Sequence, residues 1–282
     1  MASSIPSERL AGRVALVTGG ARGQGLAHAA ALAAEGAAVA IVDAPEAYKT
    51  VPYAVADRER LDAAVAELGG AGTKAVGIVA DVRSRTAVAA AVAETEAALG
   101  PVDILVANAG VCAPAAIGEI DEAAWSETVD TNLAGVLWSI QAVIPGMRER
   151  GFGRIVATSS MAGRGGMANL AHYSAAKWGV IGLVKCAALE LAGSGVTVNA
   201  ICPTTVGTEM VTHRANYQLF VPDRDDPTID DARERFGRMN PLGVPWLEPE
   251  DVAREVVHLA CDRGITTGTV VELGLGQSST HP

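Results

Sequence analysis

Positive charge and cysteine are both scarce in this sequence. Lysine and arginine number 22 against 32 acidic residues, and the resulting charge of −10 repels phosphate backbones, which argues against a nucleic-acid partner. The four cysteines form no C-x-x-C pair, which indicates reduced thiols in a cytoplasmic protein. The five histidines show no metal-ligand spacing, so no metal site is expected.

Long apolar runs are also missing. The first thirteen residues have no basic segment followed by an apolar one, so we expect no signal peptide. The apolar stretch at 27–42 is broken by Glu35 and Gly36, and no run reaches the ~18 residues of a membrane span. We therefore expect no membrane partner. Apolar residues still make up 49% of the chain, enough for a substantial core.

Short apolar runs alternate with helix-like segments along the whole chain. Strands are expected at 14–17, 38–42, 76–80, 104–107, 154–158, 196–201 and 269–272. Helices are expected at 25–35, 58–68, 86–99, 122–148, 173–191 and 250–259. This alternation predicts an α/β fold with a doubly wound parallel sheet covered on both faces.

Two segments break the alternation. The connector from Ala44 to Asp57 has fourteen residues, where a strand-to-helix loop usually needs ~2–6. The polar segment at 204–248 follows the sixth predicted strand. A long insert at a strand end more often covers a site than forms a second domain. We therefore predict a single domain across 1–282 with two covering segments, at 44–57 and 204–248, although the first could also be a plain surface loop.

A glycine-rich loop links the first predicted strand to the first predicted helix. Glycines let a backbone turn sharply and approach a ligand, and a helix N-terminus favours a pyrophosphate. A glycine cluster can also be a tight turn without a ligand. Here Asp43 ends the next strand, where a carboxylate can accept hydrogen bonds from ribose hydroxyls, so the context predicts dinucleotide binding. The loop residues predicted to contact the dinucleotide are Gly19, Ala21, Arg22, Gly23, Gln24 and Gly25.

Asp43 also bears on the choice of cofactor. A carboxylate beside the ribose repels a 2′-phosphate and favours NAD over NADP. Arg22 argues the other way, because an arginine in the glycine loop could meet that phosphate. No basic residue follows Asp43 until Lys49, so we predict NAD.

Tyr173 and Lys177 are spaced i, i+4 at the start of a predicted helix, which places both on one face. A free tyrosine has a pKa near ~10, and a nearby cation lowers it. Tyr173 could then exchange a proton with an alcohol or a carbonyl. A buried tyrosine beside a solvated lysine has the same spacing. Ser160 lies just past the preceding strand and could hold the substrate oxygen.

With Asn108-Ala109-Gly110 after the fourth strand and Asn132 in the long helix, the chain resembles the classical short-chain dehydrogenase/reductase family from Gly12 to about Glu272. The resemblance implies a Rossmann fold, a cytoplasmic oxidoreductase and a homotetramer. It implies an Asn-Ser-Tyr-Lys tetrad at Asn132, Ser160, Tyr173 and Lys177. It also implies cofactor contacts from Asn108, Ala109, Gly110, Tyr173, Lys177, Asp81, Val82, Pro203, Val206 and Thr208.

The TVPY stretch in the connector is similar to mycofactocin-coupled, carveol dehydrogenase-like members of that family. This resemblance implies tightly held NAD beneath an insert at 44–57, and a mycofactocin-type electron acceptor as partner. Val51, Pro52 and Tyr53 would lie over the adenosine half. The chain departs from the family pattern at Ala107, where many members have asparagine, and in its C-terminal tail.

We therefore predict an NAD-dependent oxidoreductase that interconverts a hydrophobic secondary alcohol, terpenoid or cyclic, and its ketone. The substrate pocket is expected to draw on Val111, Met161, Met167, Met210 and Phe220 or Trp246. Two alternatives stay open: an NADPH-dependent 3-ketoacyl or other carbonyl reductase with exchangeable cofactor, and a non-catalytic dinucleotide sensor.

Overall fold

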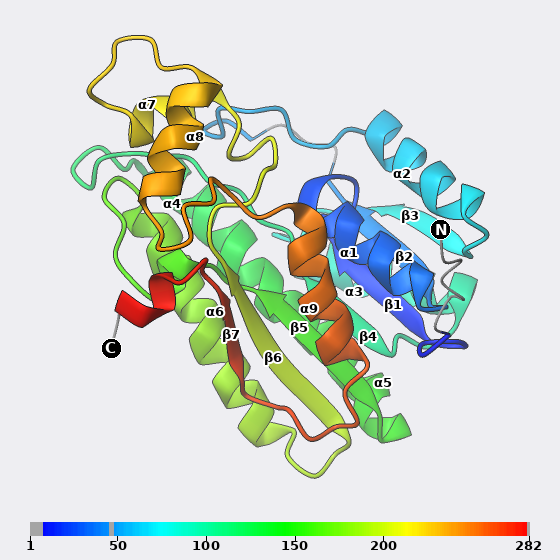
Figure 1. The fold of residues 1–282 in the computed structure, drawn as a ribbon. Helices are drawn as coiled ribbons and strands as arrows, with labels where there is room; N and C mark the ends of the chain where they lie inside the picture. The colour runs from blue at the N-terminus through cyan, green and yellow to red at the C-terminus, as the bar shows by residue number, and fades with distance from the viewer. Residues whose placement is uncertain (1–7, 45–47, 281–282) are drawn as a thin grey trace, which may run out of the picture.

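A parallel sheet of seven strands lies at the centre of the computed structural model, in the order β3-β2-β1-β4-β5-β6-β7 (Figure 1). The structure describes residues 8–44 and 48–280; residues 45–47 of the predicted insert lie outside this part of the chain. The strands are β1 (Val14–Thr18), β2 (Ala38–Asp43), β3 (Ala75–Val79), β4 (Ile104–Ala107), β5 (Gly153–Thr158), β6 (Val196–Pro203) and β7 (Val270–Leu273). Strands β1, β4, β5 and β6 are buried along their whole length, so the sheet needs cover on both faces.

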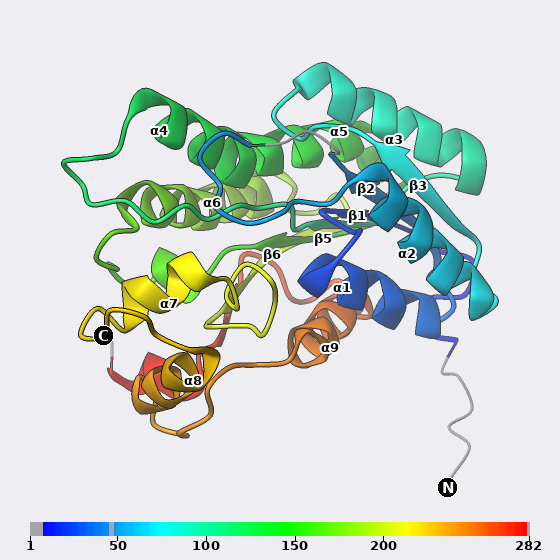
Figure 2. The same cartoon turned by 90° about the horizontal axis from the view of Figure 1, so that it is seen from above.

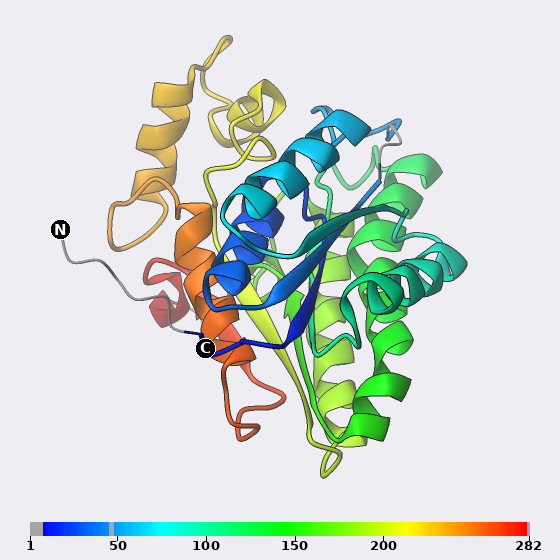
Figure 3. The same cartoon turned by 90° about the vertical axis from the view of Figure 1, so that its right-hand side faces the viewer.

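Helices supply that cover in two layers (Figure 3). One face carries α1 (Gly23–Ala34), α2 (Arg58–Gly70) and α9 (Pro249–Ala260). The other carries α3 (Arg85–Leu99), α5 (Gly135–Arg150) and α6 (Ala171–Glu190). Each layer has its own apolar core against the sheet, and none of the described helices is long and apolar enough to cross a bilayer. The predicted single-domain α/β fold is confirmed.

The predicted long helix at 122–148 is interrupted. It consists of α4 (Glu122–Val129), a π-helical segment at Asp130–Ala134 and α5. Within the wider turn, Asn132 Nδ2 donates to the carbonyl oxygens of Thr128 and Val111, both at 2.8 Å. Apolar periodicity continues through such a turn, so the sequence pattern could not show it, and π turns often occur at functional sites.

The segment after β6 folds into two helices that the sequence analysis did not predict, α7 (Arg214–Phe220) and α8 (Ile229–Arg238). Both lie above the carboxyl ends of the strands (Figures 1 and 2). Thr228 and Asp231 form a capping box at the start of α8, and the Phe236 ring packs on Phe220 with 4.7 Å between centroids. Helix α7 is short, but α8 carried a signal that the sequence analysis missed: Thr228 and Asp231 have capping-box spacing, and Ala232 and Phe236 lie on one face at i, i+4.

The buried His28 in α1 should make the stability of the fold sensitive to acid. It is fully buried, and within the described residues neither ring nitrogen has a hydrogen-bond partner. Burial lowers its pKa to about 3, whereas an unfolded histidine titrates near ~6.5, so below that pH the unfolded state binds the additional proton. The contribution of His28 to the free energy of unfolding should therefore fall by about 1.4 kcal/mol per pH unit below pH 6.5.

Urea unfolding between pH 7 and pH 5 tests this, with His28→Leu as the comparison. The variant should lose the His28 part of the slope, whatever its stability at pH 7. Equal slopes in the two proteins would show that His28 does not cause the acid sensitivity.

Candidate active site

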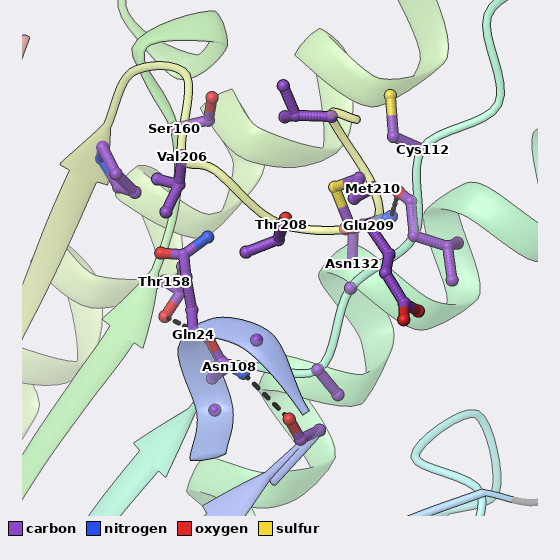
Figure 4. Close-up of a pocket in the computed structure, with 18 of the residues that line it drawn as sticks. Gln24, Asn108, Cys112, Asn132, Thr158, Ser160, Val206, Thr208, Glu209 and Met210 are labelled. Atoms are coloured by element: carbon purple, nitrogen blue, oxygen red, sulfur yellow. Dashed lines mark hydrogen bonds between the residues drawn. The ribbon is translucent and has the colours of Figure 1, made fainter. Parts of the chain in front are cut away.

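A cavity of about 920 Å³ lies at the carboxyl ends of the strands. Its wall includes residues that follow β1, β2, β4, β5 and β6. Strand order reverses between β1 and β4, and ligand crevices of open α/β sheets lie at such a reversal. Figure 4 shows side chains of the glycine loop, of the ends of β4 and β5 and of the segment after β6 converging on this space.

The glycine loop is folded tightly against the end of β4. A Cβ added at Gly19 would lie 2.8 Å from the Ala109 Cα, and one added at Gly25 would lie 1.9 Å from the Gly19 oxygen. Thr18 Oγ1 accepts hydrogen bonds from the N–H groups of Asn108 at 3.0 Å and Ala109 at 3.1 Å. The loop therefore places the N-terminus of α1 at the cavity wall, which fits a pyrophosphate.

Asp43 is held next to this loop by backbone donors. Its Oδ2 accepts from the Ala21 N–H and its Oδ1 from the Ala44 N–H, both at 3.0 Å. Burial raises the pKa of this carboxyl group, while the two hydrogen bonds and the charge of Arg22 oppose the rise. The carboxylate thus has a fixed orientation at the cavity wall, as a ribose-binding acid requires.

Tyr173 and Lys177 both reach the cavity from α6, and Ser160 faces them from the end of β5. Lys177 Nζ lies 5.6 Å from the Tyr173 ring centroid and donates to the Thr158 oxygen at 2.9 Å. Burial lowers the pKa of Lys177 to about 8. Burial, and then the nearby Cys112, raise the pKa of Tyr173, against a hydrogen bond with Ser160 that lowers it. The expected fall in the Tyr173 pKa is therefore not produced by the chain alone.

Asn132 lies close to this group through its π-helical turn. Its Oδ1 is buried and has no hydrogen-bond partner among the described residues. A Cβ added at Gly110 would lie 2.7 Å from this oxygen and 3.5 Å from Lys177 Nζ. The two groups thus flank Gly110 without a direct hydrogen bond in the described structure, an arrangement that a bridging water would complete.

All the predicted catalytic and cofactor-binding residues except Asp81 line the cavity. Asp81 does not line the cavity; its carboxylate accepts hydrogen bonds from Arg83 Nε at 2.8 and 3.0 Å, and its predicted cofactor contact stays a prediction. This ion pair with Arg83, at i, i+2, lies next to Val82, which does line the cavity. Lining residues that were predicted are Gly19, Ala21, Arg22, Gly23, Gln24, Gly25, Asp43, Val82, Asn108, Ala109, Gly110, Asn132, Ser160, Tyr173, Lys177, Pro203, Val206 and Thr208.

The wall of the cavity that contains Ser160 and Tyr173 is more apolar than polar. The predicted wall residues Val111, Met161, Met167, Met210 and Phe220 are present. Trp246 is not, because its indole packs against Gly207 instead, where an added Cβ would lie 2.7 Å away. Wall residues that the sequence analysis missed include Tyr48, Val55, Arg60, Glu67, Cys112, Leu170, Glu209, Leu219, Met239 and Gln277.

The residues of the insert at 44–57 that line the cavity differ from the predicted ones. Pro52 is exposed, and none of Val51, Pro52 and Tyr53 lines the cavity. Tyr53 is buried, and its Oη accepts from the Cys112 N–H at 3.0 Å, so it reaches the loop after β4. Ala44, Tyr48, Val55 and Ala56 form the wall from this segment instead.

Glu127 on α4 fastens the middle of the insert. Its carboxylate accepts hydrogen bonds from the Lys49 N–H at 2.8 Å, the Thr50 N–H at 3.0 Å and the Thr50 hydroxyl at 2.6 Å. Nearby, the Thr131 hydroxyl donates to Tyr48 Oη at 3.2 Å. The insert is therefore tied to the helix that leads into Asn132.

Known proteins are similar to this chain along most of its length. A family model described as short chain dehydrogenase matches residues 13–218. (-)-trans-Carveol dehydrogenase of Rhodococcus erythropolis is 40% identical over 95% of this chain and 98% of its own length. Acetoacetyl-CoA reductase of Rhizobium meliloti is 42% identical over 94% of this chain and 98% of its own.

Two solved structures are similar as well. Carveol dehydrogenase from Mycobacterium avium in complex with NAD aligns with a TM-score of 0.93 and 36% identity, over 96% of this chain and 99% of that one. Actinorhodin polyketide ketoreductase with NADPH aligns with a TM-score of 0.84 and 36% identity, over 94% and 97%. The relatives thus include complexes with either dinucleotide.

Proposed function

The chain belongs to the short-chain dehydrogenase family and is a dinucleotide-binding oxidoreductase acting on CH–OH groups, and from this premise we propose that it interconverts a hydrophobic secondary alcohol and its ketone with tightly held NAD. The observation that carries the proposal is the apolar wall beside Tyr173 and Ser160, which offers few polar partners to a charged substrate. A terpenoid or cyclic alcohol has the matching chemistry.

Four polar side chains of the site have a role in this proposal. The Ser160 hydroxyl orients the substrate oxygen, and Tyr173 takes the alcohol proton, or returns it in the reverse direction. Lys177, with a pKa of about 8, is mostly cationic at pH 7 and lies 5.6 Å from the Tyr173 ring centroid, where a positive charge favours the phenolate. A bound nicotinamide would supply the hydride acceptor and, when oxidised, further positive charge. Asn132 supports Lys177 through water.

NAD is the proposed cofactor because of Asp43 and the insert. The carboxylate is fixed at the ribose side of the glycine loop, where a 2′-phosphate would meet like charge. The insert at 44–57 contributes to the cavity wall and is anchored at both Cys112 and Glu127, which favours slow exchange. The mycofactocin-type acceptor and the homotetramer stay predictions.

An NADPH-dependent carbonyl reductase is the second candidate, since acetoacetyl-CoA reductases and a ketoreductase with NADPH are similar to this chain. A direct assay separates the two. Purified protein without added nucleotide should reduce an artificial electron acceptor when given carveol or a related cyclic secondary alcohol. Faster turnover of acetoacetyl-CoA with NADPH than of any alcohol would make the second candidate the correct one.

A further inference from the structure

One carboxylate joins two arginines at the wall of the cofactor cavity. Glu209 Oε2 accepts a hydrogen bond from Arg22 Nη1 at 2.7 Å and another from Arg60 Nη1 at 2.7 Å, and Glu209 Oε1 accepts from Arg60 Nη2 at 2.5 Å. Arg22 belongs to the glycine loop, Arg60 to the first turn of α2, and Glu209 to the segment after β6. All three line the cavity, and Figure 4 shows the Glu209 carboxylate directed away from Ser160.

The carboxylate of Glu209 offsets part of the positive charge of Arg22 and Arg60 near Asp43, the proposed ribose-binding acid. Hydrogen bonds from Arg60 and then Arg22 lower the pKa of Glu209 to about 2, although burial opposes them, so this carboxylate is ionised at neutral pH. Arg22 is close enough to Asp43 for its charge to lower the pKa of that carboxyl group. Arg22 is therefore placed to receive a 2′-phosphate, and its Nη1 donor is already engaged by Glu209.

A 2′-phosphate needs such a cation, because it would otherwise stand next to Asp43 with no opposite charge. Guanidinium groups bind phosphate through paired N–H donors, and donors already engaged by a carboxylate are not available for this. We propose that Glu209 is a specificity-determining residue, which excludes NADP by engaging Nη1 of Arg22 and both Nη groups of Arg60 and by adding its own negative charge. The inference rests on the proposed use of NAD.

The exposure of the cluster makes the proposal testable without loss of the fold. The side chains of Glu209 and Arg60 are 48% and 44% exposed, and that of Arg22 is 21% exposed. Ion pairs this close to solvent contribute little to stability. Removing the Glu209 charge should thus release the arginines and leave the protein folded.

The test compares wild type, Glu209→Gln and Glu67→Gln. Glu67 lines the same cavity from α2, so its variant loses the same charge without freeing Arg22. Each purified protein is incubated with equimolar NAD and NADP until the bound ratio is constant, then denatured, and the released nucleotides are quantified by mass spectrometry. Glu209→Gln should raise the bound NADP:NAD ratio about tenfold or more above that of Glu67→Gln. Adding Arg22→Gln to Glu209→Gln should abolish most of the gain.

Equal ratios for Glu209→Gln and Glu67→Gln would overturn the inference, as would a gain that survives the loss of Arg22. The readout is independent of activity. Preference of the wild type for NADP would instead disprove the proposed NAD dependence, and that result is distinct from an unchanged ratio in Glu209→Gln.

Discussion

Replacing Tyr173 with phenylalanine should lower kcat by about 10²-fold or more and leave the nucleotide bound. The change removes one hydroxyl, which is the proton carrier of the proposed reaction and lies beside Ser160. Phenylalanine fills the same space, and Lys177 keeps its hydrogen bond to the Thr158 oxygen, so the cofactor end of the site is preserved. Steady-state alcohol oxidation measures kcat, and nucleotide released on denaturation measures occupancy.

Tyr217→Phe is the matched control, since it removes a hydroxyl that donates to the Thr212 oxygen outside the cavity. Its kcat should stay close to that of the wild type. Near-normal turnover by Tyr173→Phe would show that another group carries the proton, and the assignment of Tyr173 would be wrong.

Replacing Lys49–Ala54 with a short glycine-serine turn should speed nucleotide release by about 10²-fold. The exchange removes Tyr53, whose burial contributes on the order of 1.5–3 kcal/mol, and its hydrogen bond with the Cys112 N–H. It also removes the bonds between Thr50 and Glu127. A total of only ~3 kcal/mol lost from the closed state corresponds to that factor, because about 1.4 kcal/mol is tenfold.

Release can be followed by displacement of bound NAD with an excess of isotope-labelled NAD. Glu127→Gln leaves the insert intact but weakens its anchor, so it should speed release in the same direction by a smaller factor. This variant keeps the test valid if the shortened loop disturbs packing around Cys112. Unchanged release in both variants, or a wild-type protein purified empty and working with exchangeable NAD, would show the insert to be only a surface loop.

The sequence by itself determined the elements that local chemistry governs. Apolar runs of strand length and helical periodicity predicted all seven strands and the helices on both faces, since burial selects side chains by position. The glycine loop was predictable because Gly19 and Gly25 allow approaches that a Cβ would block. The i, i+4 spacing placed Tyr173 and Lys177 on one helix face without knowledge of the rest of the fold.

Other features depend on where loops meet, which periodicity does not encode. Tyr53 accepts a hydrogen bond from the Cys112 N–H, 59 positions along the chain, and Pro52 is exposed and does not line the cavity. Trp246 packs on Gly207, whereas Met239 and Gln277, which the sequence analysis did not name, line the cavity.

The pairing of Glu209 with Arg22 spans 187 positions and that with Arg60 spans 149. Single charges in polar loops carry no pattern that indicates a partner. Only the tertiary structure brings these charges together, because the segment after β6 folds back against the glycine loop and the start of α2.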